Sequence, residues 1–315
     1  MSAANPGLAA RRRKSALRTL GFLSPWLIGF GVFFGYPLGA TVYFSFMKYD
    51  GFTDPVWNGF DNWTYVFTDY PFFWPALGNT LWLVAVMVSL RVVFGLGIGM
   101  LLTKIKTAPG LFRTFFYLPY LAPPVAATMA FVFLLNPGTG PVNTVLDFFG
   151  LPQPGWFSDA AWSKPALTLL ALWGIGDLMV IFLASLLDVP KEQYEAAELD
   201  GVGPWARFRY VTLPNISPIL LFAVITGVID TLQYYTQPIV ASKVSSGVIG
   251  GSGQQFEPGY PEKSTLTVPQ TVYNLGFQRF DTGAASVVAL VLFVIAMAFT
   301  ALLMRRRSGF LTAED

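Results

Sequence analysis

Three charged side chains interrupt otherwise apolar stretches of the sequence: Arg91, Asp177 and Asp230. An aspartate at the centre of a membrane helix costs about 2.5–3.5 kcal/mol on insertion scales, so both carboxylates should face a polar interior. There they can accept hydrogen bonds from the hydroxyls of a ligand, pair with Arg91, or share a proton as an acid–base dyad. The chain has no histidine and no cysteine, which excludes thiol chemistry and the usual zinc sites.

The composition is that of a membrane protein. Hydrophobic residues make up 54% of the 315 residues and charged residues only 12%, too few charges to cover the surface of a soluble domain. A helix that crosses about 30 Å of hydrocarbon needs about 20 apolar residues. The stretches that qualify are 21–47, 76–103, 114–135, 166–187, 216–241 and 284–304. We therefore expect an all-α integral membrane protein with six transmembrane helices.

The basic residues are distributed unevenly between the two sides of these spans. Fourteen of the 20 Lys and Arg residues fall in the two terminal tails and in the loops 104–113 and 188–215, and five fall in the other loops. The positive-inside rule then places both termini and the 188–215 loop in the cytoplasm. The net charge of +2 is not gathered on one face, so no nucleic-acid partner is expected.

Basic residues at 11–14 precede the first span, an order also found in secretory signal peptides. The uncharged run 21–47 spans 27 residues, which is too long for a signal core, and it lacks a clear cleavage site. We therefore expect a retained span. The predicted organisation is a cytoplasmic basic tail (1–20), a first span with its outside loop (21–75), a core (76–305) with its 188–215 loop, and a cytoplasmic tail (306–315).

The 188–215 loop carries a short motif. Its residues are Glu195, Ala196, Ala197, Asp200, Gly201, Leu213 and Pro214. Their types and spacing resemble the cytoplasmic coupling loop of permease subunits of ATP-binding-cassette (ABC) importers. Pro190 can begin a short helix that Gly201 ends, with Tyr194 as an anchor. The two alanines would let a partner surface approach the backbone, and Leu213-Pro214 would turn a second element back into the membrane.

An amphipathic helix lying on lipid headgroups is the alternative for this loop, but its acidic face disfavours an anionic leaflet. The resemblance covers residues 76–305 and is closest to the carbohydrate-uptake branch, in particular to the subunit related to the larger maltose-importer permease. Asn79-Thr80, Leu118-Pro119 and the run 283–286 also follow the family pattern.

The resemblance implies the importer-permease core fold in a multi-pass protein of the bacterial cytoplasmic membrane, surrounded by lipid. Such a subunit is not an enzyme and binds no cofactor or metal itself. The partners implied are a second homologous permease, an ABC ATPase dimer that binds ATP and Mg, and an extracytoplasmic sugar-binding protein. The absence of a Walker-type sequence from this chain agrees with ATP being bound elsewhere.

The family's pocket lies near mid-membrane on the two helices that flank the loop. The matching positions are Leu170, Gly174 and Asp177 on one helix, with neighbouring Trp173, and Gly227, Asp230, Thr231 and Tyr234 on the other. Their spacing puts each set on one helical face. The two glycines would leave room for a sugar ring, and Trp173 and Tyr234 would stack on it. Aspartates are not general at these family positions, which leaves the sugar's identity open.

The predicted function is thus a permease subunit of a binding-protein-dependent importer of di- or oligosaccharides, which couples ATPase motion to alternating access. Permeases for glycerol phosphate, polyols or polyamines share the loop and stay open as alternatives. A phosphate ester would require buried cations, and the spans contain only Arg91 against two aspartates. An intramembrane aspartyl enzyme that uses Asp177 and Asp230 is a further alternative, which would leave the loop unexplained.

Overall fold

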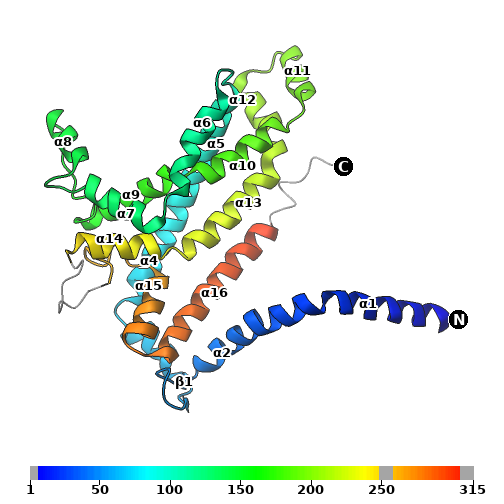
Figure 1. The fold of residues 1–315 in the computed structure, drawn as a ribbon, viewed down its shortest axis with the longest axis vertical. Coiled ribbons are helices and arrows are strands. Elements are labelled where there is room, and N and C mark those ends of the chain that lie inside the picture. The colour runs from blue at the N-terminus through cyan, green and yellow to red at the C-terminus, as the bar shows by residue number, and fades with distance from the viewer. Residues whose placement is uncertain (1–5, 248–257, 306–315) are drawn as a thin grey trace.

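The computed structural model describes residues 6–247 and 258–305. The predicted C-terminal tail 306–315, the first five residues of the predicted basic tail and residues 248–257 of the predicted core lie outside these ranges. The described chain is helical almost throughout (Figure 1), and its two short strands, β1 (Met47–Lys48) and β2 (Val56–Trp57), form one antiparallel pair. The expected all-α class is confirmed.

Most helices are apolar and belong to the membrane-length segments. The longer helices are α1 (Pro6–Phe30), α2 (Tyr36–Phe44), α4 (Phe73–Leu83), α5 (Ser89–Thr103), α6 (Pro109–Tyr117), α7 (Pro124–Leu134), α9 (Ala160–Trp173), α10 (Gly176–Leu187), α13 (Leu213–Leu232) and α16 (Thr282–Arg305). The others are α3 (Asp61–Thr64), α8 (Pro141–Phe148), α11 (Lys191–Leu199), α12 (Pro204–Arg207), α14 (Thr236–Ser245) and α15 (Val268–Tyr273). Short π-helical turns lie at Gly31–Gly35, Tyr65–Asp69, Val84–Val88, Phe208–Thr212 and Asn274–Gln278, and a 3₁₀ turn at Leu118–Leu121.

Four of the described helices are continuous, long and apolar enough to cross a membrane: Arg18–Phe44, Phe73–Thr103, Pro204–Leu232 and Thr282–Arg305. Two further segments qualify only as bent pairs, Pro109–Leu121 with Pro124–Leu134 at 96° and Ala160–Trp173 with Gly176–Leu187 at 50°. The number of spans is therefore four, or six if each bent pair counts as one. Six transmembrane helices were expected, a count that is reached only if each bent pair is one span. The fifth predicted segment ends at Leu232 rather than at 241.

Prolines cause the break in the third span. Ala122 precedes Pro123, which itself precedes Pro124, and both residues take extended backbone angles with ψ of 132° and 130°. The ring of a proline clashes with a helical residue in front of it, so each of these positions is driven out of the α region. The chain turns sharply there, and α7 leaves in a new direction.

Glycines permit the break in the fourth span. Gly174 caps the end of α9, and Gly176 begins α10. A Cβ on Gly176 would lie only 2.5 Å from the carbonyl oxygen of Phe116 and 2.6 Å from the Cα of Tyr117. Only glycine lets the α6 backbone approach this closely. The break in the fourth span therefore lies against the end of α6, the helix that precedes the break in the third span.

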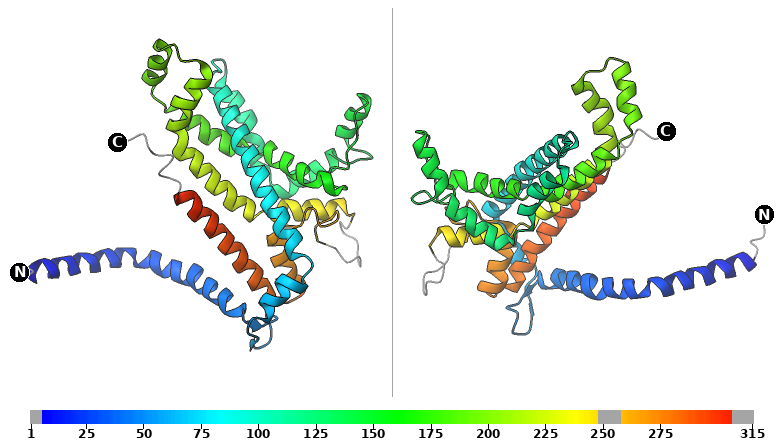
Figure 2. Two further views of the ribbon diagram at one scale, coloured as in Figure 1. Left: turned by 180° about the vertical axis from the view of Figure 1, so that it is seen from behind. Right: turned by 45° about the horizontal axis from the view of Figure 1, so that its top comes forward.

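Close packing of α5 against α10 holds the broken span to the body. A Cβ on Gly95 would lie 3.3 Å from Leu178, and one on Gly99 would lie 3.3 Å from the backbone nitrogen of Leu183. Small residues at helix contacts are the usual means of close packing in membranes. Beside this pair, α13 and α16 run next to each other, while α2 contacts α16 and α1 extends away from the body (Figures 1 and 2).

The contact at Gly176 yields a stability prediction. We expect Gly176→Ala to lower the free energy of unfolding by about 1–3 kcal/mol, because the added methyl group displaces backbone rather than a flexible side chain. Gly78→Ala is the matched control, since Gly78 lies on an exposed face of α4 with nothing within 4 Å of its Cβ position. Thermal unfolding in mild detergent measures both, and equal midpoints for the two variants would contradict the assigned contact.

Candidate functional site

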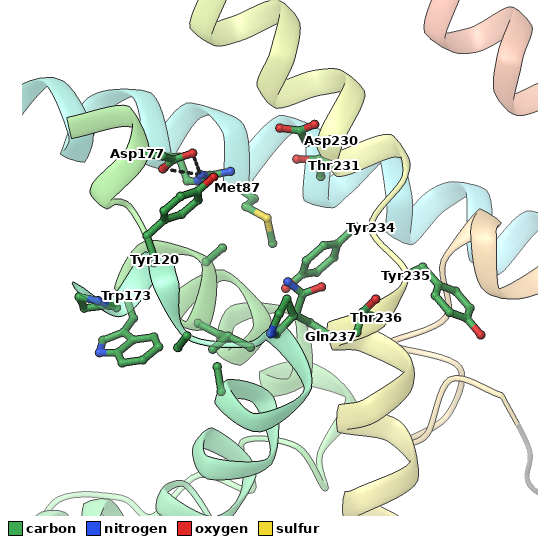
Figure 3. Close-up of a pocket in the computed structure, with 18 of the residues that line it drawn as sticks. Met87, Tyr120, Trp173, Asp177, Asp230, Thr231, Tyr234, Tyr235, Thr236 and Gln237 are labelled. Atoms are coloured by element: carbon green, nitrogen blue, oxygen red, sulfur yellow. Dashed lines mark hydrogen bonds and ion pairs between the residues drawn. The ribbon is translucent and has the colours of Figure 1, made fainter. Parts of the chain in front are cut away.

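A cavity of about 360 Å³ lies where the two broken spans meet α5 and the end of α13 (Figure 3). Its walls come from the 3₁₀ turn before Pro123, the α9–α10 break, the last turn of α13 and the start of α14. The volume lies within the range of small-molecule sites. Breaks in two spans thus produce a site-sized hollow lined by both side chains and backbone.

An ion pair crosses one wall of this cavity. The Arg91 Nη2 atom of α5 lies 3.1 Å from Oδ1 and 3.2 Å from Oδ2 of Asp177. The two side chains are 19% and 30% exposed. Asp177 also lies in the first turn of α10, where the positive end of the helix dipole stabilises a carboxylate. The structural pairing foreseen for one of the aspartates is therefore present at Asp177.

The second carboxylate has a different environment. Asp230 is exposed toward the cavity and makes no hydrogen bond or ion pair with any residue that the structure describes. It lies in the last turn of α13, which ends at Leu232, where the helix dipole favours cations rather than anions. Nor does any hydrogen bond join Asp230 to Asp177, whose two oxygens are both bonded to Arg91. This arrangement does not support a proton-sharing dyad.

Two aromatic side chains also face the cavity. The Tyr234 hydroxyl is buried and has no hydrogen-bond partner among the described residues. Trp173 is exposed, and its ring lies 5.4 Å from that of Phe131. Trp173 also lines an adjoining apolar cavity of about 610 Å³. The site thus offers flat apolar faces beside unsatisfied polar atoms, a combination suited to a ligand with both.

The structure brings seven of the eight predicted pocket residues to this cavity. They are Leu170, Trp173, Gly174, Asp177, Asp230, Thr231 and Tyr234. The expected helical faces are present only in part: Gly227, Asp230 and Thr231 do share α13. The first set is divided by the break after Trp173, and Tyr234 lies beyond the end of α13. The helix breaks bring Asp177 and Tyr234 to the cavity, whereas Asp230 and Thr231 lie there on a continuous helix.

Gly227 is the exception. A Cβ there would lie 3.1 Å from Cγ1 of Val88, so the expected room for a sugar ring at this position does not exist. The missing side chain lets α13 pack against the π-helical turn Val84–Val88 instead. Gly227 lines a separate cavity of only about 30 Å³, together with Arg91 and both aspartates.

Sequence reasoning missed Met87, Tyr120 and Thr236, which also line the cavity. Figure 3 shows Tyr120 beside Asp177, with Asp230 and Thr231 on another wall. The signal that could have located Tyr120 is the Pro123-Pro124 pair, because a break there carries the preceding turn inward. Met87 and Thr236 carry no comparable signal in the sequence.

The predicted coupling loop forms a compact helical projection at one end of the molecule, opposite β1 (Figure 1). Pro190 precedes the first residue of α11, and Gly201 follows its cap with φ of +70°. The N–H of Gly201 donates to the carbonyl of Glu198, and that of Val202 donates to the carbonyl of Ala197. These two bonds form a Schellman motif. The predicted start and stop of this helix are confirmed.

Side chains tie α11 to the following helix. The hydroxyls of Tyr194 and Thr212 lie 2.9 Å apart, and Asn215 Nδ2 donates to Gln193 Oε1 at 2.7 Å. Glu195 and Ala196 are exposed, as are Asp200 and Gly201, whereas Ala197 is only 9% exposed. Only the first of the two alanines can therefore receive a partner, and the second packs within the chain.

Leu213-Pro214 does not turn the chain, contrary to expectation. The helix is continuous from Pro204 to Leu232. A π-helical turn at Phe208–Thr212 comes just before Pro214, and the N–H of Leu213 donates to the carbonyl of Phe208. This wider turn shifts the hydrogen-bond register where the proline has no N–H to donate, so the helix passes through the proline without ending.

Comparison with known proteins assigns these features to one family. Residues 92–309 match the family described as "Binding-protein-dependent transport system inner membrane component". The chain is 32% identical over 304 residues to the probable ABC transporter permease protein YesP of Bacillus subtilis, covering 96% of this chain and 94% of YesP. It is 30% identical over 284 residues to the lactose transport system permease protein LacF of Rhizobium radiobacter, covering 88% and 90%.

Its fold is similar to that of a chain in the crystal structure of a bacterial alginate ABC transporter in complex with an alginate pentasaccharide-bound periplasmic protein. The TM-score is 0.74 at 20% identity, and the match covers 96% of this chain and 98% of that one.

The ion pair in the cavity wall can be tested with a double-mutant cycle. We expect Arg91→Gln and Asp177→Asn each to destabilise the protein, and the double variant to lose less than their sum, with a coupling of about 1–3 kcal/mol at this partly buried site. Reversible unfolding in mixed detergent micelles gives the three free energies. The same cycle with Asp230→Asn in place of Asp177→Asn is the control, and an equal coupling there would contradict a specific pair.

Proposed function

The chain belongs to the family of binding-protein-dependent transport system inner membrane components, and on that premise we propose that it is the sugar-translocating permease subunit of an ABC importer, acting on di- or oligosaccharides. It is a transport component and not an enzyme. Relatives at comparable identity, such as the lactose permease LacF, transport sugars. The cavity at the two helix breaks is the proposed place of sugar contact. It contains carboxylates that can accept hydrogen bonds from sugar hydroxyls and aromatic rings that can pack against the sugar.

One observation carries this proposal: both walls of the cavity connect directly to the projection formed by α11. On one side, α10 runs from Gly176 to Leu187, four residues before α11 begins at Lys191. On the other side, a single helix runs from Pro204 to Leu232 and carries Asp230 in its last turn. A helix is stiff along its axis, so a displacement of the projection moves both walls. This is the geometry that alternating access requires.

The proposal includes the partners that such a subunit needs. An ABC ATPase dimer, with ATP and Mg bound on it, would engage the exposed face of α11 and drive its displacement. A second homologous permease would complete the pathway, and an extracytoplasmic binding protein would deliver the sugar. The distribution of basic residues supports an orientation with both termini and α11 in the cytoplasm.

The partners can be tested together by purification of the tagged chain from its native membrane in mild detergent, followed by mass spectrometry. A second permease and an ATPase with a Walker sequence should co-purify. Proteoliposomes that contain the complex should accumulate sugar only when ATP is supplied on the side of the ATPase and the binding protein is present. Recovery of the chain without any ATPase, under conditions that preserve a known importer, would overturn the proposal.

The different burial of the two alanines gives a mutational prediction. We expect Ala196→Phe to reduce ATP-driven uptake at least about tenfold without changing the thermal midpoint, because the ring adds bulk on an exposed face against the partner. Ala197→Phe should instead lower stability by about 1–3 kcal/mol, since its side chain is buried. Ala196→Ser, which adds a single atom, is the control and should retain most uptake. Normal transport by Ala196→Phe would exclude this face as the ATPase contact.

A further inference from the structure

The cavity has an unbalanced charge. Its lining contains three charged residues, the cation Arg91 and the anions Asp177 and Asp230. Arg91 is engaged by both oxygens of Asp177, so this pair is close to neutral as seen from the cavity. The remaining charge of −1 belongs to Asp230. A ligand that enters the cavity therefore meets a net negative site in a medium of low polarity, where charge interactions are strong.

The protein does little to stabilise this second carboxylate. Asp230 lies at the C-terminal end of α13, where the unpaired carbonyls already carry partial negative charge. Among residues 6–247 and 258–305 it forms no hydrogen bond and no ion pair. The charge of Arg91 acts on it only through space, and the charge of Asp177 opposes that effect. An ionisable group inside a membrane without a structural partner indicates a functional role. Donor groups on a ligand, namely hydroxyls or ammonium groups, would supply the missing interaction.

A second, independent feature points to a ligand in the same place. The Tyr234 hydroxyl is buried against solvent, has no hydrogen-bond partner among the described residues, and lines the cavity. Figure 3 shows its ring directed into the space between α13 and the start of α14. Buried polar atoms are nearly always hydrogen-bonded, so an unsatisfied hydroxyl facing a cavity implies a partner that enters it. Tyr234 can donate to or accept from a sugar hydroxyl.

We propose that this cavity discriminates between saccharides by charge: it accepts neutral and amino-bearing sugars and rejects acidic ones such as uronates, and Asp230 is the residue that determines the preference. The inference rests on the proposed sugar-permease function and specifies its substrate class. Neutral sugars bind through hydroxyl groups that donate hydrogen bonds to Asp230 and Tyr234. An ammonium group adds a charge-assisted hydrogen bond. A carboxylate on the sugar meets the unpaired anion, whereas the charge of the one cation in the lining, Arg91, is already offset by Asp177.

The test measures binding of three linear trisaccharides with the same β-1,4 linkage: cellotriose, which is neutral, triglucosamine, which is cationic, and triglucuronate, which is anionic. The complete importer complex is placed in lipid nanodiscs without its binding protein, so that only the membrane site is measured by calorimetry. We expect triglucosamine to bind at least as tightly as cellotriose, and triglucuronate to bind at least about 30-fold more weakly, as a like-charge contact at this polarity implies.

The variant Asp230→Asn should reduce the ratio of the cellotriose affinity to the triglucuronate affinity by about tenfold, because the neutral amide removes the like charge; the readout is this ratio within each variant. Asp54→Asn is the matched control: it removes the same charge from an exposed side chain of the loop after β1 that does not line the cavity, and it should leave the ranking unchanged. Asp230→Ser is the second variant if the first does not assemble with its partners.

The outcomes separate the two proposals. Equal binding of triglucuronate and cellotriose by the unaltered complex would overturn charge selection while preserving sugar binding. A penalty that persists unchanged in both Asp230 variants would remove Asp230 from the role assigned to it. Failure of all three sugars to bind would contradict the proposed function itself, and the inference on charge would fall with it.

Discussion

The constraint on which the rest of the structure depends is the cost of polar groups in hydrocarbon. Backbone N–H and C=O groups freed from a helix, and charges without partners, are tolerated in a membrane only where protein or a wet cavity surrounds them. This chain has two broken spans and three intramembrane charges, and all of them meet at one place. The breaks at Pro123-Pro124 and Gly174–Gly176 expose backbone toward the same hollow that receives Arg91, Asp177 and Asp230. The cavity is thus the common solution for groups that cannot face lipid.

The two carboxylates illustrate how position in a helix determines what a charge does. Asp177 begins a helix and has an arginine opposite it, so both the helix dipole and the ion pair stabilise its charge. Asp230 lies in the last turn of a helix and forms no ion pair among the described residues. Residues of one type, separated by little distance in the folded chain, thus differ in role: the first ties α10 to α5, and the second remains available to a ligand. The proposed charge selection follows from that difference.

The coupling geometry depends on local exceptions to helix rules. Pro214 would ordinarily break a helix, yet the π-helical turn before it shifts the hydrogen-bond register, and the helix continues from the α11 projection to the cavity. In contrast, the fourth span breaks at Gly174 and Gly176, and the α6 backbone occupies the space that a side chain at Gly176 would need. One wall of the cavity is therefore a continuous helix, Pro204–Leu232, and the other is the bent pair α9 and α10. In the proposed transport cycle, the joint at Gly174–Gly176 is where a displacement of the projection changes the shape of the cavity.

The sequence by itself determined the membrane class, the approximate position of every apolar segment, the family, and the ends of α11. These properties depend on hydrophobicity, length and local backbone chemistry, which act over a few residues and leave a readable pattern. Tertiary structure alone decided that Arg91 pairs with Asp177, that Gly227 packs on Val88, that Ala197 points inward, and that two spans are bent. Each of these depends on which distant backbone or side chain occupies the neighbouring space, as Phe116 does at Gly176. Helical periodicity accounts for Asp230 and Thr231, which share α13, but Asp177 and Tyr234 reach the pocket through the helix breaks, which periodicity did not predict.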